Sequence, residues 1–186
     1  MKLLMNASRI NGLPVVTVRG GDDVAEVRDI IYSPEAGRLA GLTLNKRGFL
    51  SGRRREVLPE ESIHAIGRDA VMVEDESCLV LPEHAPEEVA RAGHDRNVIG
   101  DDVLTESGVS LGKVRDLALL VGSSGEVVGY EIDKVVGGRG YIPLPAQLAV
   151  SGAALIVPDM TEEFVRDDLV GLGAAVDDFR ARLGLR

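Results

Sequence analysis

Apolar and polar residues alternate in short runs along the chain, and glycine or proline separates most runs from the next. Residues 24–31, VAEVRDII, alternate in this way. Residues 38–45 form a second run after a turn at 33–37, in which proline presets φ and glycine accepts a positive φ. Short strands with regularly spaced turns are typical of small barrels and sandwiches. The pattern therefore predicts β structure over most of the chain.

One phrase of this pattern occurs twice. Val27-Arg28-Asp29 recurs as Val114-Arg115-Asp116, and each copy is followed by an apolar run, a small turn and a strand that contains glycine. Other landmarks recur in the same order: Gly21 and Gly108, Gly41 and Gly129, Leu58-Pro59 and Ile142-Pro143, and residues 70–73 and 154–157. An internal duplication explains this order. We expect each copy to close its own sheet, which removes exposed strand edges.

Two further segments differ from the two copies in composition and in the spacing of their apolar residues. The segment 82–96 is polar and charged, so it is predicted to be a linker with a helical turn near its middle. After Pro158, Thr161 can cap a helix through its hydroxyl, and the apolar residues that follow have partial helical spacing. The predicted organisation is a first barrel at 1–81, a polar linker at 82–96, a second barrel at 97–160 and a helical tail at 161–186.

The order of these landmarks resembles the PRC-barrel family, the small β-barrel of the photosynthetic reaction-centre H subunit and of the C-terminal half of a ribosome maturation factor. The matching phrases are residues 25–29 with 39–41, residues 111–116 with 127–129, and the closing strand 67–73. Copy one departs from copy two by having Ala25 in place of Gly112. The resemblance implies an all-β protein of two tandem small PRC-like β-barrels with a short helical C-terminal tail. It also implies a non-catalytic module for protein contacts or assembly, with no cofactor.

Composition narrows the range of partners. The chain has 186 residues with 21 basic and 30 acidic side chains, which gives a formal net charge of -9. A negative field disfavours general binding to nucleic acid and adsorption to an anionic membrane. No apolar run approaches the length of a transmembrane helix, and no secretory signal is evident. We therefore expect a cytoplasmic protein with no membrane insertion, and neither specific role of the two named family members.

Candidate chemistry is sparse. His64, His84 and His94 lack the spacing of metal ligands, and His64 alternates with apolar residues, so it is expected to face solvent. Three acidic residues precede Cys78 and disfavour its thiolate. The glycine-rich stretch 137–140 opens no helix, so it does not predict a phosphate site. We expect no catalytic, metal or cofactor-binding residue, and hence no enzyme.

Asp29 and Asp116 are the repeated carboxylates of the Val-Arg-Asp phrase. The structural interpretation is that each ends its strand and accepts hydrogen bonds from a neighbouring turn of its own barrel. The alternative is that each Arg-Asp pair forms a binding surface.

A basic cluster is the sharpest local feature of the sequence. Its members are Lys46, Arg47, Arg53, Arg54 and Arg55. One interpretation is a solvated hairpin end or an edge strand protected by charge. The other is a docking patch for an acidic protein surface, including the acidic segment of another copy, which would give a homo-oligomer. The sequence thus predicts a protein-interaction or assembly module whose partner is unknown. The alternative function is a ribosome- or RNA-associated maturation factor that uses the same cluster.

Overall fold

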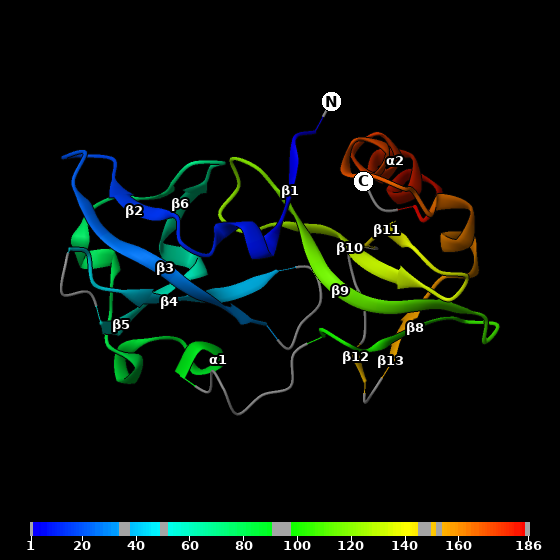
Figure 1. The fold of residues 1–186 in the computed structure, drawn as a ribbon, viewed down its shortest axis with the longest axis horizontal. Helices are drawn as coiled ribbons and strands as arrows, with labels where there is room; N and C mark the ends of the chain where they lie inside the picture. The colour runs from blue at the N-terminus through cyan, green and yellow to red at the C-terminus, as the bar shows by residue number, and fades with distance from the viewer. Residues whose placement is uncertain are drawn as a thin grey trace.

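The computed structural model describes residues 2–33, 38–48, 52–90, 98–144, 150–151 and 154–184. Two β-sheets follow one another along an elongated molecule, and the longest helix lies near the C-terminus (Figure 1). The first sheet has six strands in the order β5-β4-β3-β2-β7-β6, and the second has the order β11-β10-β9-β8-β13-β12 with β1 added to β9. The predicted all-β class with a short C-terminal helix is confirmed.

The elements have the following bounds. The first sheet consists of β2 (Pro14–Thr17), β3 (Asp23–Tyr32), β4 (Leu39–Asn45), β5 (Arg53–Pro59), β6 (Ile63–Ile66) and β7 (Val71–Val73). The second consists of β1 (Leu4–Asn6), β8 (Asp102–Thr105), β9 (Ser110–Leu120), β10 (Val127–Lys134), β11 (Arg139–Pro143), β12 (Val150–Ser151) and β13 (Ala154–Val157). The α-helices are α1 (Glu87–Ala90) and α2 (Leu169–Arg182), and the 3-10 helices are η1 (Ala7–Ile10), η2 (Glu60–Ser62), η3 (Glu76–Cys78), η4 (Pro82–His84) and η5 (Asp159–Phe164).

The second sheet repeats the strand order of the first. In each sheet a short strand pairs in parallel with the closing strand: β2 pairs with β7, and β8 pairs with β13. In both sheets a glycine of the strand next to the edge faces the proline that ends the edge strand: Gly41 of β4 lies opposite Pro59, and Gly129 of β10 lies opposite Pro143. The duplicated sequence landmarks therefore occupy equivalent positions in the two sheets.

The two repeats meet around an approximate two-fold axis. Arg38 directly precedes β4, and Glu126 directly precedes β10, so the two residues are equivalent. They form an antiparallel bridge with each other. A contact between equivalent residues is the mark of an isologous interface, in which the axis passes between the two partners. The chain is thus built like a dimer whose two halves are joined covalently.

One continuous core joins the two repeats, contrary to the expectation of two separately closed barrels. Its buried residues come from both sheets and include Leu39 of β4 and Leu119 of β9. The edge of β6 is paired by the second repeat, since Ile66 N donates to Ser123 O at 2.7 Å and Gly122 N donates to Ile66 O at 2.8 Å. The first sheet therefore relies on the second repeat to cover the edge of β6, and the two sheets exclude water from one shared core.

Strand β1 crosses between the repeats. It pairs antiparallel with β9, with Leu4 opposite Leu120 and Asn6 opposite Ala118. The strand belongs to the segment predicted as the first barrel, 1–81, yet its hydrogen bonds add it to the second sheet. The sequence pattern could not decide the question, because an apolar triplet shows that a strand forms and not which sheet it joins.

The segment after each sheet packs on the same outer face. Val89 of α1 is buried against Ile31, Ala40 and Val57 of the first sheet. Helix α2 covers the corresponding face of the second sheet, where Leu172 and Val176 pack with Ala118, Val128 and Leu4. The described part of the predicted linker 82–96 therefore contributes to the core, while 91–96, including His94, lies outside the described residues.

The C-terminal helix begins later than the sequence indicated. Asp168 caps α2 by accepting a hydrogen bond from Gly171 N at 2.7 Å. Thr161, the predicted cap, lies inside η5 and is buried. None of the described helices has the length and apolar character that crossing a membrane requires.

Candidate protein-docking site

The basic cluster gathers where β4 ends and β5 begins, at one end of the long axis (Figure 1). Lys46 N donates to Gly52 O at 2.9 Å and holds these two strand ends together. Strand β5 forms one edge of the first sheet. Within it, Arg53 and Arg55 are exposed and Arg54 is half-buried, as the alternation of a strand requires.

Arg47 is neutralised by acids of its own sheet. Its Nε donates to Asp23 Oδ2 at 2.8 Å, and its Nη1 donates to Glu26 Oε2 at 3.0 Å. The hydrogen bond with Asp23 raises the pKa of Arg47, and the charges of both carboxylates act in the same direction. These bonds hold Arg47, and with it the end of β4, against β3.

Arg54 is also paired with acidic residues of the fold. Its side chain is 17% exposed, and it pairs with Glu76 at 2.7 Å and with Glu56 at 3.2 Å. It also donates to Val24 O. Burial alone would lower the pKa of Arg54, but the bond with Glu76 and the charge of Glu56 outweigh burial and raise it. Arg54 thus fastens β5 to η3 and is part of the fold.

The remaining three cations point to solvent. Lys46, Arg53 and Arg55 are exposed, and none of them forms an ion pair with any of the residues that the structure describes. The five-residue patch of the sequence hypothesis therefore reduces to three unpaired positive charges. We call these three residues the cationic site.

Asp29 and Asp116 lie in equivalent positions but in different surroundings. Each carboxylate accepts a hydrogen bond from the next backbone N–H of its own strand at 2.8 Å, from Ile30 in one case and from Leu117 in the other. Asp116 is only 6% exposed, and both of its oxygens lie 3.3 Å from Ser8 N of η1. Asp29 is exposed.

The contacts of these carboxylates differ from the expected bond to a turn of the same barrel. Each carboxylate accepts a hydrogen bond from a backbone N–H of its own strand, at a point where the neighbouring strand has ended. In the second repeat, Asp116 also holds η1, which belongs to the first repeat. In the second repeat, Arg115 pairs with Asp133 at 3.4 Å and not with the neighbouring Asp116.

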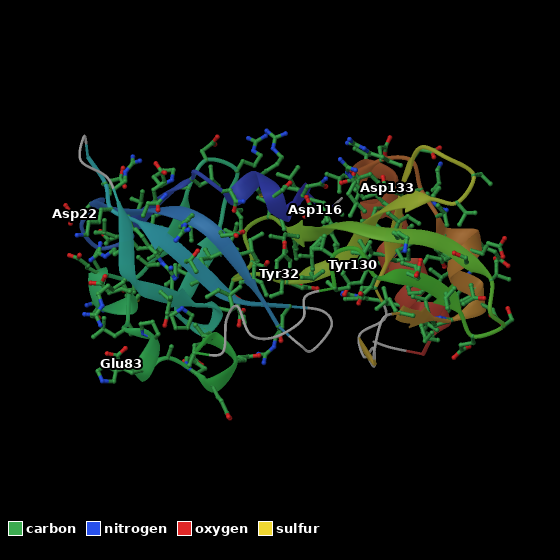
Figure 2. All side chains as sticks on the ribbon, turned by 60° about the horizontal axis from the view of Figure 1, so that its bottom comes forward. Asp22, Tyr32, Glu83, Asp116, Tyr130 and Asp133 are labelled. Atoms are coloured by element: carbon green, nitrogen blue, oxygen red, sulfur yellow. The ribbon has the colours of Figure 1, made fainter. Side chains whose placement is uncertain are left out.

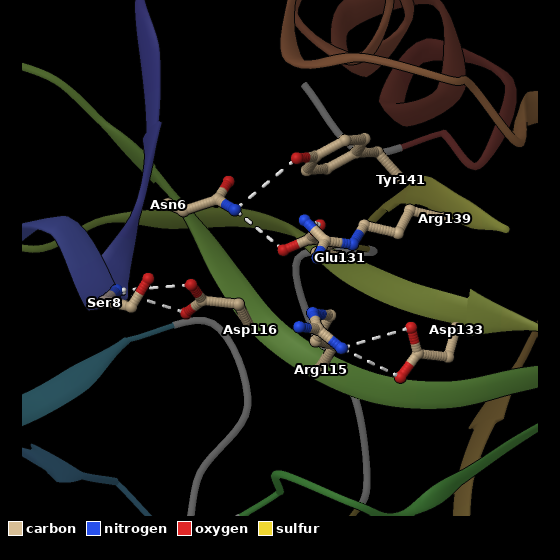
Figure 3. A network of polar contacts seen from close by, with 8 residues as sticks. All are labelled: Asn6, Ser8, Arg115, Asp116, Glu131, Asp133, Arg139 and Tyr141. Carbon is tan, nitrogen blue, oxygen red and sulfur yellow. Dashed lines mark hydrogen bonds and ion pairs between the residues drawn. The ribbon is translucent and has the colours of Figure 1, made fainter.

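A polar network around the buried Glu131 fastens β1 to the second sheet (Figure 3). Glu131 of β10 is 3% exposed and accepts a hydrogen bond from Asn6 Nδ2 at 2.7 Å. Asn6 Nδ2 also lies 3.4 Å from the Tyr141 hydroxyl, and Arg139 approaches Glu131 at 3.5 Å. Sequence reasoning missed this network, although a lone glutamate inside the apolar run of β10 was a visible signal for it. Its role in the described structure is to fix the crossing strand.

Tyr32 lies where the repeats meet, near Asp116 in the middle of the molecule (Figure 2). Burial, together with the charges of Asp116 and Asp29, raises the pKa of Tyr32 to about 12. Burial also raises the pKa of Tyr130. Both phenols are therefore neutral at physiological pH and act as packing groups.

The other candidate residues are dispersed. His64 and His84 are exposed, which agrees with the expectation for His64, and Cys78 is half-buried in η3. Within the described ranges, no group of three or more His, Cys, Asp or Glu side chains could hold a metal ion.

The first sheet lies within a segment that matches a known family. Residues 4–77 match the model of the PRC-barrel domain. This segment is therefore similar to the PRC-barrel domain. The match runs from β1 to η3, so it contains the whole cationic site and Asp29, whereas Asp116 lies in the second sheet. No curated protein matches the chain.

Proposed function

We propose that this protein is a non-catalytic assembly module of two tandem PRC-barrels, located in the cytoplasm, and that its cationic site docks an acidic protein partner. The observation that carries the proposal is the contrast within the basic cluster. Arg47 and Arg54 are paired with acids of the fold, whereas Lys46, Arg53 and Arg55 remain unpaired and exposed among the described residues of a chain with net charge -9.

Unpaired like charges repel one another, and their mutual repulsion favours a partner that supplies the opposite charge. Charge complementarity of this kind contributes specificity and a fast association rate more than raw affinity. An acidic chain would ordinarily repel an acidic partner, so a local cationic site also fixes the orientation of docking.

The second PRC-barrel of the proposal rests on three likenesses to the first. These are the strand order, the glycine that faces the proline of the edge strand, and the helix after each sheet that covers the same outer face. The non-catalytic part rests on the match of residues 4–77 to the PRC-barrel domain.

The decisive experiment separates the two classes of basic residue. The test variant is K46S/R53S/R55S, and the matched control is R47S/R54S, which removes only cations that serve the fold. Thermal melting, native pull-down read by mass spectrometry, and RNA titration at two salt concentrations are compared. We expect the test variant to keep its melting temperature and to lose a stoichiometric acidic partner, and we expect the control to melt earlier and to keep that partner.

Two other outcomes would assign the site differently. Tight RNA binding by the parent protein that weakens steeply with salt and disappears in K46S/R53S/R55S would favour the ribosome- or RNA-associated function. Sedimentation of the parent as an oligomer that the same variant dissociates would identify another copy of the chain as the acidic partner.

A further inference from the structure

Part of the outer edge of β5 has no backbone partner among the residues that the structure describes. Strand β5 lies beside β4 at one edge of the first sheet (Figure 1). On the side away from β4, Val57 N donates to Val80 O at 2.8 Å and Val80 N donates to Val57 O at 3.0 Å. No described residue makes such bonds to Arg53 or Arg55. The chain itself therefore uses only one end of this edge.

The backbones of Arg53 and Arg55 face the same side as the backbone of Val57. The N–H and C=O groups of an edge strand alternate between the paired side and the open side, so residues two apart present theirs to the same side. At the start of β5, Lys46 N donates to Gly52 O, which directs the groups of the following residue, Arg53, away from β4. The register shift between the strands adds an even number of residues to β5, so the alternation continues across it. Donors and acceptors of both arginines thus lie along the open edge.

The same stretch carries unpaired positive charge. Arg53 and Arg55 lie on one face of β5, and both are exposed without an ion pair to any described residue. Side chains two residues apart on a strand are separated by roughly 7 Å. An added strand with an acidic residue at every second position would place one carboxylate opposite each arginine.

We propose that the open edge of β5 at residues 53–56 accepts an extended acidic segment as an additional antiparallel strand, with a carboxylate opposite Arg53 and another opposite Arg55. The inference deepens the proposed function and rests on it, because it states in which form the acidic partner reaches the cationic site. The antiparallel direction follows from Val80, which pairs antiparallel at the same edge. In this mode of recognition, main-chain hydrogen bonds supply affinity and alternate side chains supply specificity.

The positive charge of this edge selects the strand that can be added. Edge strands that carry Lys or Arg resist pairing with other chains. A second copy of β5 would bring arginine against arginine, and like charges directly opposite each other destabilise a strand pair. An acidic strand replaces this repulsion with attraction. The charge that prevents aggregation therefore also specifies the partner.

The equivalent edge of the second repeat lacks this combination. There β11 is the edge strand, and Tyr141 pairs with Arg166 at the position equivalent to Val57. The cation of β11, Arg139, is already paired with the buried Glu131 at 3.5 Å. Of the two equivalent edges, the edge in the first repeat is thus the one suited to an acidic strand.

Titration of the full chain with synthetic peptides tests the proposal. The probe peptide has glutamate at every second position with threonine between, and the matched control peptide has the same composition with its glutamates adjacent in pairs. We expect the probe to bind more tightly than the control peptide. We also expect the amide proton resonances of Arg53 and Arg55 to move downfield in NMR spectra, because these N–H groups gain acceptors.

N-methylation of the probe tests the strand geometry directly. In an antiparallel pair the glutamates opposite the arginines direct their own N–H groups toward β5, and the threonines direct theirs away. N-methylation of the glutamates is therefore expected to weaken binding roughly tenfold or more, whereas N-methylation of the threonines is expected to leave the affinity unchanged.

Two variants of equal charge test the role of the arginines. R53S/R55S is expected to bind the probe roughly tenfold more weakly. R9S/R68S is the matched control, because Arg9 and Arg68 are also exposed, have no ion pair with the described residues and lie outside β5. The control is expected to bind the probe as the parent does.

Four results would overturn the proposal. The first is failure of the probe to bind; if K46S/R53S/R55S nevertheless loses an acidic partner in the pull-down, the proposed function stands without strand addition. The second is equal binding of the two glutamate patterns, and the third is unchanged binding after N-methylation of the glutamates. The fourth is displacement of the probe by a lower concentration of single-stranded RNA, which would assign the edge to nucleic acid.

Discussion

Asp116 lies beneath η1, where water cannot replace it as a hydrogen-bond acceptor. Asp116→Ala would leave Leu117 N and Ser8 N without their acceptor. We expect this change to lower the free energy of unfolding by about 1–3 kcal/mol, the usual effect of leaving buried donors unsatisfied. Urea denaturation of the parent and the variant measures the difference.

Asp29 provides the matched control for that prediction, because it makes the same bond to the next N–H from an exposed position. Asp29→Ala is expected to have a clearly smaller effect, since water can satisfy Ile30 N. Asp116→Asn, which retains an acceptor oxygen, should lie between the parent and Asp116→Ala. Equal losses at the two aspartates would show that burial is not the deciding factor.

Gly41 and Gly129 owe their identity to close packing of neighbouring strands. A Cβ atom would lie 2.5 Å from Leu58 O at position 41 and 2.3 Å from Ile142 O at position 129. Each Gly→Ala change is expected to destabilise the protein by about 1–3 kcal/mol, as overpacking does. Gly52→Ala is the control, because a Cβ atom there would meet nothing within 4 Å. Thermal melting of the three variants should show a loss only at positions 41 and 129.

At the scale of elements, β1 and α2 stabilise each other on the outer face of the second sheet. Leu4 of β1 and Leu172 of α2 belong to one buried cluster. Leu4→Ala and Leu172→Ala are each expected to cost about 2–4 kcal/mol, because each leaves a cavity against the other element. Denaturant unfolding of each single variant gives these two losses.

The double variant tests the coupling of β1 and α2. Residues that share a buried cluster are usually non-additive by 0.5 kcal/mol or more. The loss in L4A/L172A should therefore differ from the sum of the single losses by about that amount. Simple additivity would mean that β1 and α2 attach to the sheet independently.

At the scale of the whole molecule, the continuous core makes the two repeats one cooperative unit. Buried residues of both sheets lie in a single cluster, and the edge of β6 is paired by the turn after β9. We expect a single thermal transition whose calorimetric and van't Hoff enthalpies agree. Two resolved transitions, or a core substitution that shifts only part of the signal, would contradict this prediction.

Cooperative unfolding also bears on the proposed docking function. The cationic site is attached to a single packed body rather than to a barrel on a flexible linker. An acidic partner docked there would then have a fixed orientation relative to the second repeat. A rigid scaffold of this kind lowers the entropy lost on assembly.

The strands, their turns and their recurrence could be predicted from the sequence alone. Alternation, glycine position and proline position are local properties, and each translates directly into strand faces and turn geometry. This is why the repeated Val-Arg-Asp phrase and the paired landmarks at Gly41 and Gly129 fall at equivalent points of two sheets with one strand order. The basic cluster was equally visible as a run of charge.

Which parts of these elements meet depends on how the whole chain packs. Packing places β1 in the second sheet, buries Asp116 under η1 but leaves Asp29 exposed, and pairs Arg47 and Arg54, whereas Arg53 has no ion pair with the residues that the structure describes. Each of these outcomes depends on residues that are far apart in the chain, such as Glu76 beside Arg54. Local periodicity carries no information about such distant neighbours, whereas packing brings them within hydrogen-bonding distance and so determines which charges remain available for a partner.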